Sequence, residues 1–163
     1  MTKDEIITMC KDYGERFGLR PVLIQAIVET ESNYETRAMR YEPGYRYTTQ
    51  VNVLAQAMRV TPETEEALQK FSYGLMQIMG GVARELGFTG YLPDLLIPQI
   101  GMGYACKHLK NLTERYGSSE RAVVASYNAG SPIYKPDGVL FANQQYVDKV
   151  YSIVRRLENV ITN

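Results

Sequence analysis

Glu31 is the residue of this sequence best placed for acid–base chemistry. In a helix over residues 21–31, the i, i+3, i+4, i+7 spacing puts Glu31 on the same face as Ile24, Ile27 and Val28. Burial disfavours the charged form of a carboxyl group and raises its pKa, so such an acid can hold and donate a proton near neutral pH. Taken alone, a glutamate at the end of an amphipathic helix is more often a partly exposed residue at the edge of a core.

Periodicity and capping signals predict the helices that would position this acid. A capping box at Thr2 and Glu5 opens the first helix, and Thr61 followed by Pro62 opens another. The segment 33–49 has no apolar period, so we expect a loop rich in aromatic and charged side chains. Convincing alternating strands are absent, and the predicted fold class is therefore all-α, or α with minimal β. The predicted helices cover about residues 2–17, 21–31, 51–58, 61–71, 75–86 with an interruption at Gly80-Gly81, 98–116, 118–130, and 143 onward.

The size and charge of the chain narrow its class. The chain has 163 residues, so we expect one domain over residues 1–163 with its own hydrophobic core. We also expect the protein to be a monomer. Lys and Arg together number 18, as do Asp and Glu, so the net charge is zero and bulk electrostatic binding to nucleic acid is not expected. We expect Cys10 and Cys106 to be buried free thiols, because neither belongs to a metal-binding spacing. His108, the only histidine, is expected to be exposed and without chemistry.

The N-terminus is charged and leads into an amphipathic stretch, so no signal peptide is visible. No apolar run reaches membrane-spanning length. Three explanations therefore stay open: the protein acts where it is made, another agent carries it across a membrane, or a leader has been removed.

Four short motifs follow one another along the chain: Glu31-Ser32, Gly74-Leu75-Met76-Gln77, Ser126-Tyr127-Asn128-Ala129-Gly130, and Tyr146. In this order, and over residues 21–34 and 73–151, the sequence resembles the lysozyme-like domain of the soluble lytic transglycosylases, family 1. The resemblance implies a lysozyme-like helical domain that cleaves the β-1,4 bond between N-acetylmuramic acid and N-acetylglucosamine in peptidoglycan glycan strands. Without an export signal, a bacteriophage endolysin, a virion-associated enzyme or a secretion-system accessory would fit.

The resemblance implies a reaction with one carboxyl group. Glu31 would be the sole acid/base, which protonates the leaving glycosidic oxygen and then takes a proton back. The substrate's N-acetyl carbonyl would attack the anomeric carbon, and the sugar's own 6-hydroxyl would close a 1,6-anhydro product. No second carboxylate, metal or cofactor would then be needed.

The same resemblance implies substrate-binding roles for the first two motifs. Ser32 would hydrogen-bond near the catalytic carboxyl or the N-acetyl group, and Gly74 would allow the backbone to approach the cleft closely. Met76 and Gln77 would line that cleft with a soft wall and an amide. Taken alone, Met76 would more often be a core residue.

The last two motifs would complete the set. By resemblance, Tyr127 and Asn128 would position the acid and the sugar, and Tyr146 would point its hydroxyl toward Glu31. Taken alone, Tyr127-Asn128 before Gly130 is equally well a helix C-terminal motif, and an isolated Tyr146 is more often a core aromatic.

The connection between the first two motifs is longer than is usual in the family. We expect this insertion, about residues 35–72, to form part of a glycan-binding wall or a lid. If Glu42, or less favourably Glu35, faced the sugar as a second carboxylate, the enzyme would be a hydrolysing muramidase. A salt bridge from Glu42 to Arg40 or Arg46 is the favoured alternative for that residue. A third hypothesis is a non-catalytic glycan-binding module.

Overall fold

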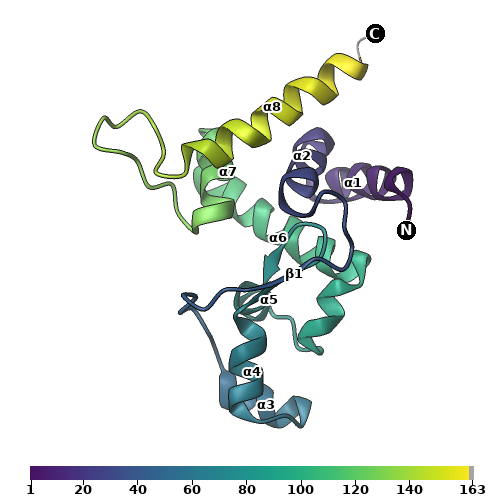
Figure 1. The fold of residues 1–163 in the computed structure, drawn as a ribbon, viewed down its shortest axis with the longest axis vertical. Coiled ribbons are helices and arrows are strands. Elements are labelled where there is room, and N and C mark those ends of the chain that lie inside the picture. Colours follow the sequence, from purple (N-terminus) through teal and green to yellow (C-terminus); the bar gives the residue numbers. More distant parts are fainter. Residues whose placement is uncertain (162–163) are drawn as a thin grey trace. The chain divides into compact units, whose positions relative to one another are not determined.

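Figure 1 shows the computed structural model, which describes residues 1–161. The chain forms two compact units. The first contains Met1 and residues 31–105, and the second contains residues 2–30 with the chain from Cys106 onward. Helices dominate, and the one small sheet of the described residues belongs to the first unit, so the predicted fold class is confirmed.

The second unit is built from helices. It contains α1 (Lys3–Phe17), α2 (Pro21–Ser32) as far as Thr30, α6 (Pro98–Tyr116) from Cys106, α7 (Glu120–Ala129) and α8 (Gln144–Ile161). The predicted capping box of Thr2 and Glu5 opens α1, which ends at Gly18 in the left-handed conformation. Ser119 caps α7 as its Oγ accepts from the backbone N–H of Ala122.

Apolar stripes of these helices form the core of the second unit. Its side chains that are at most 1% exposed include Ile6, Cys10, Leu109, Val124 and Val150. Both cysteines are buried and free, as predicted. Burial raises the pKa of both thiols, that of Cys10 to about 12, which keeps them protonated and unreactive.

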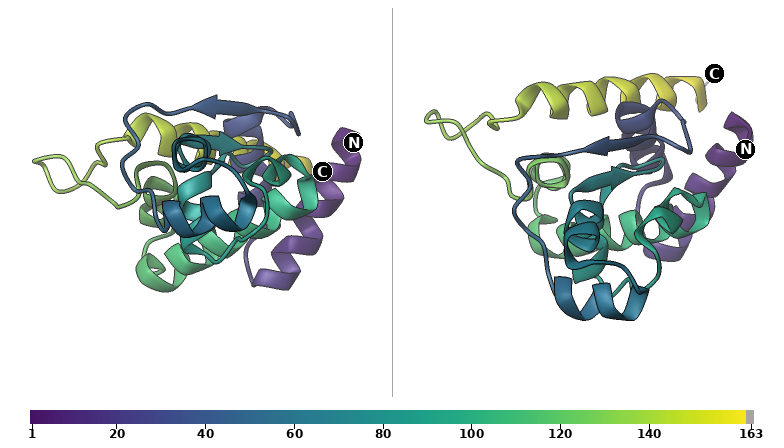
Figure 2. Two further views of the ribbon diagram at one scale, coloured as in Figure 1. Left: turned by 90° about the horizontal axis from the view of Figure 1, so that it is seen from below. Right: turned by 60° about the horizontal axis from the view of Figure 1, so that its bottom comes forward.

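The first unit combines short helices with a small antiparallel sheet. Its helices are α3 (Val51–Met58), α4 (Pro62–Gln69), α5 (Gly80–Glu85), the 3₁₀ helix η1 (Leu92–Leu96), and α6 as far as Ala105. Its strands are β1 (Met39–Tyr41), β2 (Phe71–Tyr73) and β3 (Ile78–Met79), in the order β1-β2-β3. Helices α3 and α4 lie side by side, and α4 also contacts α5 (Figure 2). Thr61 caps α4 and Pro62 begins it, as predicted.

The predicted helix over 75–86 is wrong in its first half. The chain instead makes a β-hairpin, with β2 and β3 joined by a turn at residues 74–77, and only Gly80–Glu85 is helical. The turn forms because Gly74 (φ 68°) and Gln77 (φ 49°) both adopt the left-handed conformation, which a helix interior excludes. Strand β1, within the predicted loop 33–49, was also missed, because all three of its side chains are exposed and show no alternation.

The glycines of α5 and α6 serve close packing against backbone. A β-carbon at Gly80 would lie 2.6 Å from the carbonyl oxygen of Leu68, and one at Gly81 would lie 2.6 Å from that of Tyr47. At Gly101 of α6, a β-carbon would lie 2.2 Å from the carbonyl oxygen of Leu95 in η1. Small residues here therefore admit the backbone of η1 and of the insertion.

None of the helices in residues 1–161 combines the length and the apolar character needed to cross a bilayer.

Candidate active site

Glu31 and Ser32 form the C-terminal end of α2. Ile24, Ile27 and Val28 of the same helix are fully buried, and Glu31 is partly buried, as the spacing predicted. The Ser32 hydroxyl donates a hydrogen bond of 2.8 Å to the carbonyl oxygen of Leu75. This bond attaches the end of α2 to the hairpin that carries the second motif.

The chain reverses abruptly after Ser32. Asn33 (φ 49°) and Tyr34 (φ 67°) are both left-handed, a conformation that is costly for a bulky side chain such as tyrosine. Two such residues in succession end α2 at a defined point, and the backbone N–H of Glu35 then donates to the carbonyl oxygen of Ser32 at 3.0 Å. The position of Glu31 at a helix end is thereby fixed by local backbone geometry.

The Gln77 side chain is used within the hairpin. Its Nε2 donates to the carbonyl oxygens of Ala38 (3.0 Å) and Gly74 (2.9 Å), and its Oε1 accepts from the Ser72 hydroxyl (2.8 Å). Both amide hydrogens are thus engaged, so Gln77 joins the turn to the end of β1. The sequence predicted this amide as a group that lines the cleft; in the structure its hydrogen bonds support the turn, and a role toward substrate stays a prediction.

Gly74 and Met76 are both buried. A β-carbon at Gly74 would lie 3.0 Å from the carbonyl oxygen of Leu95, and the left-handed φ adds to the requirement for glycine. Met76 is only 1% exposed, so in this conformation it packs in the core and presents no wall to a ligand. The predicted close approach at Gly74 is therefore an approach to η1 (Leu92–Leu96).

Three candidate residues belong to the second unit. Tyr127, partly buried, and Asn128, exposed, lie in the last turn of α7, before Gly130 (φ 79°) caps it. Asn143 precedes α8, and its Nδ2 donates to Asn128 Oδ1 at 3.0 Å. Tyr146, in the first turn of α8, is partly buried. The structure thus connects the third motif to the start of the helix that carries the fourth.

The sequence suggested that His108 is exposed, and this prediction is wrong. The residue is partly buried in α6, and its ring lies 5.6 Å, centroid to centroid, from that of Tyr127. Burial lowers its pKa from 6.5 to about 4, because the charged imidazolium loses water there. A histidine with this pKa is neutral at neutral pH.

The titration of His108 predicts an acid-sensitive stability. Between about pH 6.5 and pH 4 the unfolded chain binds a proton that the folded chain does not, so stability falls as pH falls through this window. We expect the melting temperature of the wild type to drop more from pH 7 to pH 4.5 than that of His108→Phe, which keeps a ring without the proton. Because His108 is the only histidine, its NMR resonances are unambiguous, and a midpoint near pH 6.5 would contradict its burial.

The two residues considered from the sequence as a second carboxylate, Glu42 and Glu35, have local partners. Glu42 forms an ion pair with Arg40, which confirms the salt bridge expected for it. Glu35 accepts a 2.9 Å hydrogen bond from the backbone N–H of Arg37. Among the described residues, no group of three or more histidine, cysteine or acidic side chains is arranged to hold a metal ion.

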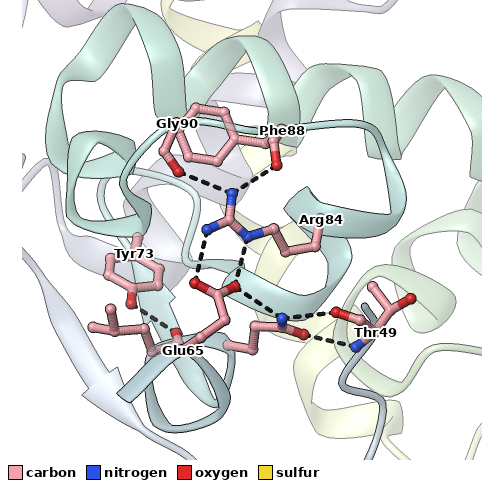
Figure 3. A network of polar contacts seen from close by, with 8 residues as sticks. Thr49, Glu65, Tyr73, Arg84, Phe88 and Gly90 are labelled. Atoms are coloured by element: carbon pink, nitrogen blue, oxygen red, sulfur yellow. Dashed lines mark hydrogen bonds and ion pairs between the residues drawn. The ribbon is translucent and has the colours of Figure 1, made fainter. Parts of the chain in front are cut away.

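Sequence reasoning missed a buried polar network inside the first unit (Figure 3). Glu65 of α4 and Arg84 of α5 are joined by two hydrogen bonds of 2.8 and 2.9 Å, with both side chains at most 1% exposed. Gln69 donates to Glu65 Oε1 and exchanges two hydrogen bonds with the backbone of Thr49. The one local signal for this network is the spacing of Glu65 and Gln69, four residues apart on one helix, which places the two side chains side by side.

Arg84 completes the network at the other side. Its Nη1 donates to the carbonyl oxygens of Phe88 (2.7 Å) and Gly90 (2.8 Å). A buried guanidinium is tolerated only when its donors are satisfied, and these four hydrogen bonds engage four of the five N–H groups of Arg84. The network therefore ties the insertion, through α4, to α5 and the segment that follows it.

Comparison with known proteins points to one family. Residues 8–137 match the model of the transglycosylase SLT domain. The protein IpgF of Shigella flexneri is 31% identical over 136 residues, which cover 82% of this chain and 73% of the relative. IpgF of Shigella sonnei is similar to the same extent. No solved structure matches significantly.

Proposed function

The chain belongs to the transglycosylase SLT family, and we propose that it cleaves peptidoglycan glycan strands with Glu31 as sole acid/base, leaving 1,6-anhydro-muramic ends. Membership indicates peptidoglycan cleavage of the lytic transglycosylase type, and hence action on the cell wall. The observation that carries the finer proposal is the position of Glu31. It is partly buried and lies on the same face of α2 as Ile27 and Val28, which are completely buried.

The proposed reaction has two steps. In the first, the Glu31 carboxyl gives its proton to the glycosidic oxygen as the bond to the anomeric carbon breaks, while the substrate's N-acetyl oxygen bonds to that carbon. In the second, the Glu31 carboxylate takes the proton of the sugar's 6-hydroxyl, whose oxygen displaces the N-acetyl oxygen. Glu31 ends protonated, and no water is consumed.

We propose that the first-unit motif residues act mainly by positioning. Ser32 fixes the end of α2 on the hairpin, and Gln77 holds the hairpin turn on β1. Gly74 allows that turn to pack on η1, and Met76 fills the core beneath it. For Tyr127, Asn128 and Tyr146 the proposed role stays that of substrate-binding residues.

The ion pair of Glu42 supports transglycosylation over hydrolysis. To activate water as a second carboxylate, Glu42 would have to leave Arg40, which neutralises it. A reaction that uses the substrate's own N-acetyl group requires no such group. Delivery by phage lysis, a virion or a secretion system stays a prediction.

The products distinguish the two reactions. We expect mass spectrometry of purified peptidoglycan digested by the protein to find muropeptides with anhydro ends, each lighter by one water than the corresponding reducing ends. Peptidoglycan digested in parallel with a commercial hydrolysing muramidase supplies the reducing-end control. Reducing ends as the main product would replace the proposed reaction with hydrolysis.

A further inference from the structure

A row of aromatic rings crosses the sheet of the first unit from its edge to the core. Tyr41 of β1 lies opposite Phe71 of β2, with ring centroids 5.0 Å apart, and the ring of Tyr73 follows at 6.3 Å. Tyr73 is fully buried, and its hydroxyl donates to the carbonyl oxygen of Leu68 at 2.7 Å. Tyr41, at the other end, is 47% exposed. One end of the row is thus anchored and the other faces solvent.

The backbone that carries Tyr41 is held at both ends of β1. Before the strand, the N–H of Gly74 donates to the carbonyl oxygen of Ala38 at 2.7 Å, and after it the N–H of Glu42 donates to that of Lys70 at 2.8 Å. A ring fixed in this way loses little conformational entropy when it binds a ligand. Tyr41 is therefore preorganised.

The segment after Tyr41 is fixed as well. The Tyr45 ring packs against α5 so closely that a β-carbon at Gly81 would lie 2.7 Å from its Cε1. Gln69 then holds the backbone of Thr49 by two hydrogen bonds, of 2.8 and 2.9 Å. Of the two forms expected for the insertion, this anchoring favours a wall over a lid.

The strand that carries Phe71 and Tyr73 leads into the turn that Ser32 contacts, within the first unit. The Ser32 hydroxyl, next to Glu31, is bonded to Leu75, and Leu75 lies four residues along the chain from Phe71. Four residues of chain span at most about 14 Å, so the two Cα atoms lie within that distance. Exposed Arg37 lies near the segment and complements the carboxylates of the stem peptides that peptidoglycan carries.

We propose that Tyr41 stacks on a sugar ring of the bound glycan strand and is a substrate-binding residue outside the four motifs. Tyrosine suits this role because its apolar face covers the C–H face of a pyranose ring while its hydroxyl reaches the polar rim. The proposal rests on the proposed function for the identity of the ligand. The glycan strand is thus the ligand of the exposed end of the row.

The test combines binding and kinetics. In the Glu31→Gln background, sedimentation with insoluble peptidoglycan measures binding, and in the wild-type background release of muropeptides gives KM and kcat. We expect Tyr41→Ala to weaken binding and raise KM by about threefold to tenfold with little change in kcat, and Tyr41→Phe to keep both near wild type. Tyr91→Ala is the matched control, because Tyr91 is 54% exposed in the same unit but lies outside the sheet.

Thermal melting separates stacking on sugar from a role in the fold alone. If Tyr41→Ala melts lower but binds peptidoglycan as Tyr91→Ala does, the ring serves the Tyr41–Phe71 contact only and the inference is overturned. If Tyr41→Ala loses binding while the unmodified protein releases no muropeptides, the inference stands and the proposed reaction fails. If Tyr41→Ala cleaves peptidoglycan with an unchanged KM, the proposed reaction stands and the inference about Tyr41 is overturned.

Discussion

Glu31→Gln is expected to lower the rate of peptidoglycan cleavage by at least about 10²-fold to 10⁴-fold, the usual contribution of a general acid. The substitution keeps the shape of the side chain and removes the proton that the leaving oxygen needs. Binding to insoluble peptidoglycan and the melting temperature should change little, because Glu31 is partly exposed and its isostere makes similar contacts. The measurement is the loss of turbidity of purified cell walls.

Glu29→Gln is the matched control for this prediction. Glu29 lies two residues earlier on the same helix, and its carboxylate is paired with Arg156. Its neutralisation should leave cleavage near the wild-type rate. Wild-type activity in Glu31→Gln would eliminate both the transglycosylase and the hydrolase interpretation, whereas equal loss in both variants would point to a general effect on α2.

Arg84→Ala is expected to destabilise the protein by about 3 to 5 kcal/mol, because it leaves the Glu65 carboxylate buried without its partner. For a chain of this length, that corresponds to a fall in melting temperature of roughly 6 to 20 °C. Glu65→Ala should have a similar effect, since it leaves the Arg84 guanidinium buried without its partner. Thermal unfolding followed by circular dichroism measures both.

Two controls define the origin of that loss. Replacing both partners, Glu65→Leu with Arg84→Met, should cost less than either single substitution, because no charge is then left buried alone. Lys110→Ala breaks the exposed pair of Lys110 with Glu114 and should change stability by less than about 1 kcal/mol. A loss of less than about 1 kcal/mol in Arg84→Ala would mean that the buried network does not hold the insertion.

Local signals in the sequence were sufficient for much of the fold. Helices begin where expected at the capping residues Thr2 and Thr61, and they end where expected at the left-handed Gly18 and Gly130. Each of these residues satisfies backbone groups within its own turn. The Glu31-Ser32 pair at the end of α2 was predicted in the same way. Such features depend on residues a few positions apart.

The features that the sequence did not reveal depend on distant partners. The turn at residues 74–77 is held by the Gln77 side chain on Ala38, 39 positions away, so an apolar period continuing through residue 86 was misleading. The burial of Met76 and the use of the Gln77 amide follow from that turn. Likewise, Glu65 and Arg84 are 19 positions apart, and nothing local distinguishes them from surface charges.

The central claim is that Glu31 drives cleavage of the glycan strand without water. Digestion of purified peptidoglycan in water enriched in the heavy oxygen isotope tests it in one measurement, with Glu31→Gln alongside. We expect the wild type to release anhydro muropeptides that carry none of the label at their new ends, and the variant to release none. Label at the new ends, or the same products from Glu31→Gln, would contradict the account.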